Sequence, residues 1–399
     1  MSFKPVKRIE VENKHLKLRL LLAALAVVVA IAAFGYGIRA LLDRNSGWQE
    51  VESYVDGVDC SSEFTFQYYF ESSSGANYKT LSTLYTQALE EAYLLFYPAG
   101  GLAEINSHPN EAVEVEPALY SALKLIQSTG NRCLYLAPVY EEYDRVFLFE
   151  NETEAERYDP ERNEEIREYV AQIANVANDP QMINIELLGD NRVRLFMSDE
   201  CVEFAAENGI ESFLDFGWMR NAFIADHIAD TFVSNGYTKG FIASYDGFTR
   251  NLDTREEGYS FNLFDRLDKV IYCPAVMEYT GPMSIVYLRN YPISDADRWH
   301  YFGFSDGKYA TAFVSPETGL SASSTDNLVA YSQRAGCAEI MLKISHVFLA
   351  DELDESKLEL LKGEEIDSVW FEDVVLKHTE SSLAVTATKE AQIAGYKIP

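Results

Sequence analysis

The chain has 399 residues, of which 47% are hydrophobic and 13% aromatic, enough apolar material to argue against intrinsic disorder. Its formal net charge is −30. A surface of that sign repels the phosphate backbone of nucleic acids, so we expect no nucleic-acid partner.

The N-terminus differs in charge from the rest of the chain. Residues 1–44 carry a net charge of +5 and residues 45–399 a net charge of −35. Residues 20–38 contain no charged residue and no proline, and the apolar run extends to residue 42. At about 1.5 Å per residue, this run is long enough to cross the hydrocarbon core of a bilayer. The sequence therefore predicts a single transmembrane helix over residues 20–42.

Basic residues set the expected orientation of that helix. Six precede it within residues 1–19 and only two closely follow it. The positive-inside rule then places residues 1–19 in the cytosol and residues 45–399 on the outer side of the cell membrane, as an extracytoplasmic domain. A cleavable signal peptide is the alternative. It fits less well because its apolar region is usually only about 7–15 residues long.

Beyond residue 45, hydrophobic periodicity predicts a mixture of helices and strands. Helical spacing covers residues 78–97, 117–129, 161–177, 226–235 and 331–349. Aromatic or β-branched runs predict strands at residues 62–70, 192–197, 240–243, 283–288, 299–304, 369–371 and 383–387. Helices and strands do not alternate strictly, and no long linker interrupts them. We therefore expect an α+β fold in one domain, or in two lobes folded together, over residues 45–399.

The five cysteines carry no recognisable motif. They are Cys60, Cys133, Cys201, Cys273 and Cys337, spaced 64 to 73 residues apart. No pair has CxxC or zinc-knuckle spacing, and an odd number leaves at least one thiol free. We expect most of them to be buried as small hydrophobic residues.

Four segments, taken in order, resemble the FAD:protein FMN transferase (ApbE-like) family. Glu104-Ile105-Asn106 and the helix that follows resemble the family's Glu-Ile-x-x-x-Asn turn. Residues 215–226 align without gaps to its Asp-Leu-Gly-Gly-Ile-Ala-Lys-Gly-Tyr-Ala-Val-Asp. Residues 293–319 are similar to its hairpin and His-x-x-Asp-Pro-x-Thr-Gly turn, and residues 336–339 stand where it has Ala-Asp-Ala-x-Ala-Thr. The resemblance covers most of residues 45–399 and implies an FMN-transferase-like fold.

The resemblance implies a flavin site and a metal site. The family cleaves FAD and attaches FMN to a Thr or Ser of an exported protein with the help of Mg²⁺, a phosphoryl transfer that needs charge neutralisation. By position, Glu339 is the candidate metal ligand. The expected FAD contacts are Trp218, Asp246, Asp297, Thr318 and Lys343.

Several positions that carry the family's chemistry are substituted. The second metal-ligating position is Lys343, whose ammonium repels a cation. The family's His and Asp before Pro-x-Thr-Gly are replaced by Ala312 and Ser315, and its Lys-Gly pair by Asn221-Ala222. Trp218 replaces a glycine, which would crowd a close backbone approach. A carboxylate is also missing at residues 135–137, and the family's Ser-Gly-Asp becomes Asp295-Ala296-Asp297, which keeps only its last acid. This pattern predicts that Mg²⁺ binding and transfer are lost while the fold is kept.

Three hypotheses follow from these observations. The first is a membrane-anchored, non-catalytic relative that binds an exported partner protein or retains a flavin. The second is a divergent but active Mg²⁺-dependent FAD:protein FMN transferase. The third is an unrelated extracytoplasmic ectodomain with an interactive role. The sequence assigns no catalytic residue.

Overall fold

A computed structural model describes the chain except for residues 1–45, 55–62, 72–74 and 381. The predicted transmembrane segment, residues 20–42, and Cys60 lie outside the described residues. Within the described ranges, no helix combines the length and the apolar character needed to cross a membrane.

The chain divides into two compact units. One comprises residues 1–49 and 69–77, and the other residues 50–68 and 78–399. Three elements contain residues of both units: β1 (Gly47–Glu50), β2 (Phe64–Phe70) and α2 (Gly75–Phe96). The site described below lies in the larger unit.

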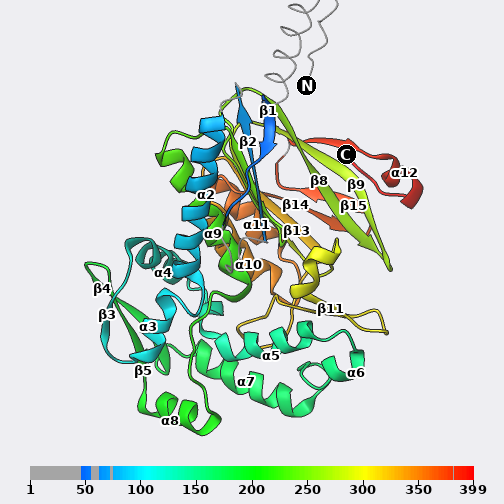
Figure 1. Cartoon of the computed structure of the whole chain (residues 1–399). Coiled ribbons are helices and arrows are strands. Elements are labelled where there is room, and N and C mark those ends of the chain that lie inside the picture. The colour runs from blue at the N-terminus through cyan, green and yellow to red at the C-terminus, as the bar shows by residue number, and fades with distance from the viewer. Residues whose placement is uncertain (1–45, 55–62, 72–74, 381) are drawn as a thin grey trace, which may run out of the picture. The chain divides into compact units, whose positions relative to one another are not determined.

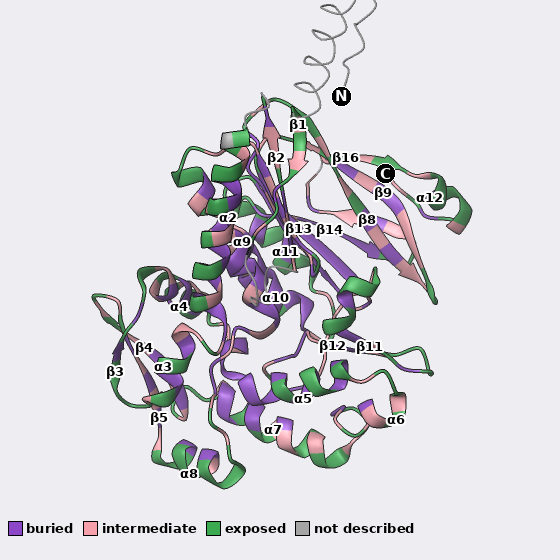
Figure 2. Cartoon of the chain, viewed as in Figure 1, coloured by how far each residue is buried: buried purple, intermediate pink, exposed green. Residues whose placement is uncertain are grey.

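The main sheet of the larger unit is antiparallel (Figure 1). From β2, its strands follow the order β2, β6 (Gly240–Ser244), β7 (Phe248–Asn251), β10 (Met283–Arg289), β13 (Asn327–Ser332), β14 (Asp367–Glu372) and β15 (Val375–His378). All residues of β10 and β13 are buried, and Figure 2 shows the buried centre of this sheet. Strands whose two faces are both covered appear in the sequence as nearly continuous apolar runs.

Three smaller sheets surround the main one. They are β16-β9-β8 (Ala384–Ala387, Val270–Thr280, Gly258–Leu267), β3-β5-β4 (Ala112–Glu114, Arg192–Met197, Ile183–Gly189) and β11-β12 (Tyr301–Gly303, Tyr309–Thr311). The first shares one hydrophobic core with the main sheet, in which Leu263 and Met277 belong to the same buried cluster as Ile285 and Val329.

Helices pack around the sheets. The α-helices are α3 (Gly101–Ser107), α4 (Pro117–Thr129), α5 (Ala137–Leu148), α6 (Glu152–Ala155), α7 (Glu164–Asn178), α8 (Asp199–Asn208), α9 (Arg220–Ser234), α10 (Cys337–Phe348), α11 (Glu355–Leu361) and α12 (Lys389–Ala394). Short 3-10 helices are η2 (Cys133–Tyr135), η3 (Gly217–Met219), η4 (Asp295–Trp299) and η5 (Lys362–Glu364). Figure 1 shows α9 and α10 beside the main sheet, and both contact it and each other.

The expected α+β class is confirmed, although several elements have bounds that differ from those predicted. The helix over residues 117–129 and the strand over 192–197 have the predicted bounds. The helix predicted from residue 331 begins only at Cys337, because Tyr331 and Ser332 end β13. A short buried apolar run is ambiguous between helix and strand, and here pairing of Tyr331 with Ile285 and Asp367 settles it as strand.

The described cysteines behave as expected. Cys133, Cys201 and Cys337 are buried, Cys273 is half-buried, and all four are free thiols. Burial raises the pKa of the Cys133 thiol to about 12 and that of Cys201 to about 11. These thiols are therefore protonated at neutral pH and weak as nucleophiles.

Candidate functional site

A cluster of buried polar residues lies where the sequence places the flavin contacts. Asn221 is in the first turn of α9, and its Nδ2 donates to Glu63 Oε2 at 2.6 Å and to Asp246 Oδ2 at 3.0 Å. Asp246 lies in the turn between β6 and β7. Burial raises its pKa to about 6. Burial, followed by the charge of Asp246, also raises the pKa of Glu63. The two carboxyls therefore hold a proton more tightly than they would in water.

A buried ion pair forms the next part of the cluster. Arg289 ends β10, and its Nη2 donates to Asp297 Oδ1 at 2.6 Å and to the carbonyl of Tyr245 at 3.1 Å. Both charged side chains are only 2% exposed. Asp297 Oδ2 accepts the backbone N–H groups of Ile293 and Ser294, which fixes the start of η4.

Aromatic rings connect Trp218 to this ion pair. Trp218, in η3, packs edge-on against Phe313 with ring centroids 5.2 Å apart, and Phe313 packs against Tyr301. The Tyr301 hydroxyl donates to the carbonyl of Arg289 at 2.9 Å. His300 precedes Tyr301, and burial lowers its pKa. The structure thus brings Trp218, Asp246 and Asp297 into one region of the fold.

Several atoms of this cluster are buried without a hydrogen bond from the described part of the chain. They are Trp218 Nε1, Arg220 Nε, Asn221 Oδ1, Asp246 Oδ1 and Arg289 Nε. A buried polar group without a partner costs about 1–3 kcal/mol, and such groups are rare in folded proteins. Three donors and two acceptors of this kind in one cluster indicate a place that a polar ligand or ordered water completes.

A cationic pocket lies next to the cluster. It has a volume of about 370 Å³, and its lining includes Arg266, Lys308, Thr311 and Ser321 together with one carboxylate, Glu161. Asn290, which directly follows Arg289, also lines it, and Thr311 pairs with Tyr301 across β11 and β12. The volume falls near the lower end of the range for small-molecule sites, about 300–1,000 Å³. Two cations with hydroxyl groups suit an anionic ligand, even though the chain as a whole is acidic.

Thr318 lies beside this pocket but not in its wall. It is exposed, and its Oγ1 accepts the backbone N–H of Leu320 at 3.2 Å. The base of its turn, where Val314 pairs with Ser321, adjoins the pocket. Gly319 has φ +71°, and a Cβ there would lie 2.7 Å from the carbonyl oxygen of Val170. The glycine of this motif is therefore required by packing as well as by backbone conformation.

The predicted metal position does not fit a metal ion. Lys343 Nζ lies 2.5 Å from Glu339 Oε1 and also forms an ion pair with Glu364 of η5. Its ammonium neutralises the one carboxylate that the resemblance retains. Among the residues that the structure describes, no group of three or more His, Cys, Asp or Glu side chains could hold a metal. Glu339 and Lys343 thus form an ion-pair network on α10.

Another residue of the aligned motif has a structural role. Asp226 of α9 accepts the backbone N–H of Cys337 through Oδ1 and that of Ala338 through Oδ2, each at 2.9 Å. It also pairs with Arg250 of β7. A Cβ at Gly336 would lie 2.4 Å from Asp226 Oδ2, so a side chain there would displace the Asp226 carboxylate. These contacts join α9 to the start of α10, where an acceptor satisfies free N–H groups.

Solved structures with the same architecture decide the fold. The ApbE protein of Thermotoga maritima matches with a TM-score of 0.55 and 14% identity, over 87% of this chain and 98% of that chain. The flavin transferase ApbE of Vibrio cholerae matches with a TM-score of 0.54 and 13% identity, over 87% and 99%. A mutant of the Vibrio cholerae protein matches with a TM-score of 0.52 and 14% identity, over 83% and 95%.

This chain has the ApbE fold. The expected resemblance is thereby confirmed at the level of structure. No protein-family model matches the sequence, and no curated protein matches it either. The ApbE fold here carries a sequence that has diverged far from those of the solved ApbE proteins.

The sequence did not point to several residues of the site. Glu63, Arg289 and His300 belong to the polar cluster, and Arg266 and Lys308 to the pocket. Arg289 carried one usable signal, because it is a charged residue that directly ends an apolar run and precedes Asp297 by eight residues. The others carry no motif of their own.

Proposed function

We propose that this chain is a membrane-anchored, extracytoplasmic ApbE-fold protein that binds a flavin nucleotide without transferring FMN through Mg²⁺. The observation that carries the proposal is the unpartnered polar cluster next to a cationic pocket. Buried donors and acceptors without partners, beside two cations, match a ligand with a polar ring system and phosphates.

Each part of the site has a corresponding part of such a ligand. The N–H groups of Trp218, Arg220 and Arg289 would donate to ring carbonyl or phosphate oxygens, and the oxygens of Asn221 and Asp246 would accept from ring N–H or hydroxyl groups. Arg266 and Lys308 would neutralise phosphate charge. When bound, the flavin would supply its own redox chemistry.

Transfer is not part of the proposal because the residues that the structure describes offer its metal no fitting ligands. Phosphoryl transfer needs a cation that bridges phosphate oxygens in line with a nucleophile. Lys343 is a single charge held between two glutamates, and it cannot bridge two oxygens. A partner protein outside the cytosol would then bind this protein, or take up its flavin, noncovalently, and would not be modified with FMN.

A binding experiment tests the flavin part of the proposal. FAD is titrated into the full-length protein and followed by flavin fluorescence. We expect Arg266→Gln with Lys308→Gln to weaken binding at least about tenfold, since each charge-assisted contact contributes about 1.5–3 kcal/mol. The matched control is Lys124→Gln with Arg157→Gln, which removes the same charge from exposed positions.

The outcome distinguishes the hypotheses. Equal weakening by both double variants would indicate nonspecific attraction and contradict the site. Absence of flavin binding in the unmodified protein would contradict the proposal itself and favour an ectodomain that acts only through protein contacts.

A further inference from the structure

A second pocket, which shares Arg266 with the cationic pocket, has a strongly acidic lining. It has a volume of about 530 Å³ and is formed by the end of β8, the loop before β13, the loop after α10 and the turn after β14. Its lining includes six carboxylates, Asp265, Asp326, Asp351, Glu352, Glu372 and Asp373, and one cation, Arg266. Of the residues proposed to contact flavin, only Arg266 lines it.

Half of these carboxylates are already committed to other groups. Asp265 Oδ1 accepts Asn327 Nδ2 at 2.6 Å. Asp326 Oδ1 lies 3.3 Å from Arg266 Nη2, and Glu372 lies 3.1 Å from Lys377 Nζ. Asp351, Glu352 and Asp373 are exposed and have no hydrogen bond or ion pair from the described part of the chain. The pocket thus keeps three free negative charges at its rim.

The wall of the pocket holds an unused hydrogen-bond donor. Trp370 of β14 lines the pocket and is 3% exposed, and its Nε1 has no hydrogen-bond partner among the described residues. A buried indole N–H normally finds an acceptor. A simple cation, such as a metal ion or a polyamine, would neutralise the carboxylates but has no acceptor for this donor.

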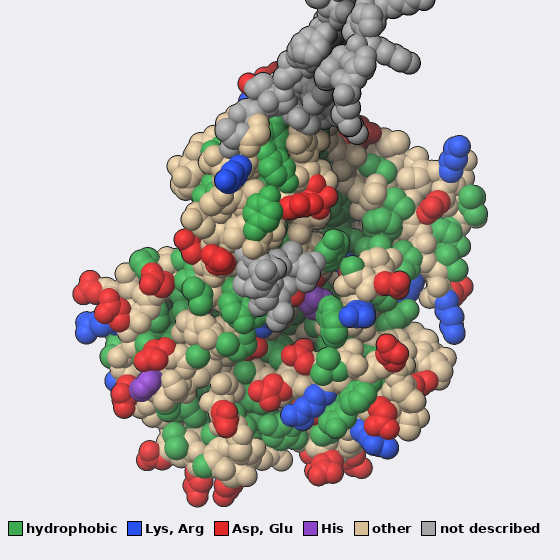
Figure 3. Space-filling view, in the orientation of Figure 1, with side chains coloured by type: hydrophobic (Ala, Val, Ile, Leu, Met, Phe, Trp, Pro, Cys, Tyr) green, Lys and Arg blue, Asp and Glu red, His purple; other side chains and the backbone are tan. Residues whose placement is uncertain are grey.

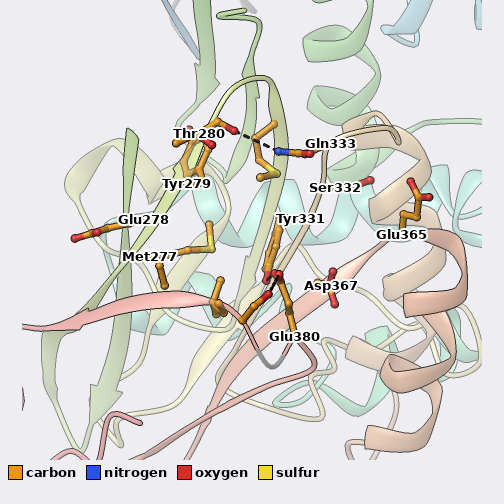
Figure 4. A pocket seen from close by; sticks show the side chains of 14 residues that line it. Met277, Glu278, Tyr279, Thr280, Tyr331, Ser332, Gln333, Glu365, Asp367 and Glu380 are labelled. Atoms are coloured by element: carbon orange, nitrogen blue, oxygen red, sulfur yellow. Dashed lines mark hydrogen bonds between the residues drawn. The ribbon is translucent and has the colours of Figure 1, made fainter. Parts of the chain in front are cut away.

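A comparison with another acidic pocket shows the difference (Figure 4). That pocket, of about 330 Å³, is lined by Glu278, Glu365, Asp367 and Glu380. Glu278 accepts Thr386 Oγ1 at 3.0 Å, and Glu365 forms an ion pair with Arg334 at 2.6 Å. Asp367 accepts Thr379 Oγ1 at 3.2 Å, and Glu380 accepts the Tyr331 hydroxyl at 2.8 Å. Each of these four carboxylates thus has a partner within the chain, unlike the three at the rim of the pocket beside Trp370.

We infer that the pocket beside Trp370 binds a basic polypeptide segment, with a lysine or arginine at the acidic rim and a backbone carbonyl on the Trp370 N–H. A peptide supplies both the cation and the acceptor that the pocket lacks. The excess of carboxylates on the visible surface of this protein, seen in Figure 3, would speed the encounter but would not distinguish this pocket. This inference does not rest on flavin binding.

The experiment measures binding of a defined peptide to the full-length protein. The probe is a fluorescein-labelled, amidated Gly-Arg-Gly-Lys-Gly-Arg-Gly peptide, followed by fluorescence anisotropy. We expect the triple variant Asp351→Asn, Glu352→Gln, Asp373→Asn to weaken binding at least about tenfold. The control triple variant Glu200→Gln, Glu203→Gln, Glu207→Gln on α8 changes the net charge equally and should change affinity less than about twofold.

Two further measurements separate the pocket from general attraction. Trp370→Phe keeps the ring and removes the donor, and we expect a loss of about fivefold, the value of one ordinary hydrogen bond. Spermidine, which has charge but no acceptor, should compete more weakly than the unlabelled peptide. Equal loss in both triple variants, equal competition by spermidine, or no binding by the unmodified protein would overturn the inference. If Trp370→Phe melts early, the triple variants decide alone.

Discussion

Asp246 shows how burial changes a single side chain of the site. Its carboxyl is 7% exposed and its pKa is raised to about 6, mainly by burial. Folding therefore favours the protonated form. The stability contributed by Asp246 is present at about pH 4 and is lost as pH rises towards about 6.

The substitution Asp246→Asn removes this titration. We expect the free energy of unfolding of the wild type, minus that of the variant, to fall by up to about 3 kcal/mol between pH 4 and pH 7. Urea unfolding at several pH values measures it. Asp354→Asn is the control, because hydrogen bonding to Ser356 lowers the pKa of Asp354 and gives a slope of opposite sign. A flat difference for Asp246→Asn would contradict the buried, protonated carboxyl.

At the residue scale, the sequence predicted only part of the site. Trp218 and Asp297 lie in aligned segments, which is why the resemblance pointed to them, and flavin contact by Trp218, Asp246 and Asp297 stays a prediction. Glu63 was not predicted, because it meets Asn221 only after the chain has folded back over a separation of 158 residues. Arg289 lies only eight residues before Asp297, but no aligned motif contains it. Lys343, which the resemblance placed at the second metal position, forms ion pairs with Glu339 and with Glu364 of η5.

The junction between α9 and α10 shows how one carboxylate joins two elements. Asp226 accepts two N–H groups at the start of α10 and pairs with Arg250. In Asp226→Asn, the amide accepts fewer of these bonds and leaves Arg250 without its counter-charge. We expect a loss of about 2–4 kcal/mol in denaturant unfolding.

A matched cap on another helix provides the control. Asp354 caps α11 by accepting the N–H of Ser356 at 3.0 Å and is exposed. Asparagine is an equally good cap residue, so Asp354→Asn should cost no more than about 0.5 kcal/mol. Similar losses in the two variants would show that Asp226 is only an ordinary cap.

The changed metal position on α10 allows a test by reconstruction. Glu339→Asp with Lys343→Thr restores the residue types of the family and removes the ammonium. We expect the double variant to gain Mg²⁺ affinity, measured by calorimetry, without gaining FMN transfer, because Ala312, Ser315 and Asn221 remain changed. Lys343→Thr alone is the control for simple charge removal. Useful turnover by the double variant would show that the metal was the only missing part.

At the scale of elements, prediction succeeded where the pattern was local. The amphipathic helix α4 and the strand β5 have their expected bounds. The paired strands β8 and β9 were missed, although they form a long antiparallel hairpin. Their half-buried residues do not alternate cleanly, and their stability comes from the core shared with the main sheet.

For the whole molecule, the charge asymmetry predicts a membrane topology. With residues 20–42 spanning the bilayer and residues 1–19 in the cytosol, protease added outside intact cells should degrade residues 45–399. A cytosolic protein expressed in the same cells serves as the control and should stay intact until lysis. Protection of residues 45–399 before lysis would contradict the proposed orientation.

The central claim is flavin binding without Mg²⁺-dependent transfer, and one measurement tests it directly. Full-length protein is incubated with FAD and an exported acceptor protein containing a flavinylation threonine, with and without Mg²⁺. Bound flavin and acceptor mass are then determined by absorbance and mass spectrometry. We predict intact FAD bound equally in both conditions and an acceptor of unchanged mass. An Mg²⁺-dependent gain of one FMN on the acceptor, with release of AMP, would contradict the account.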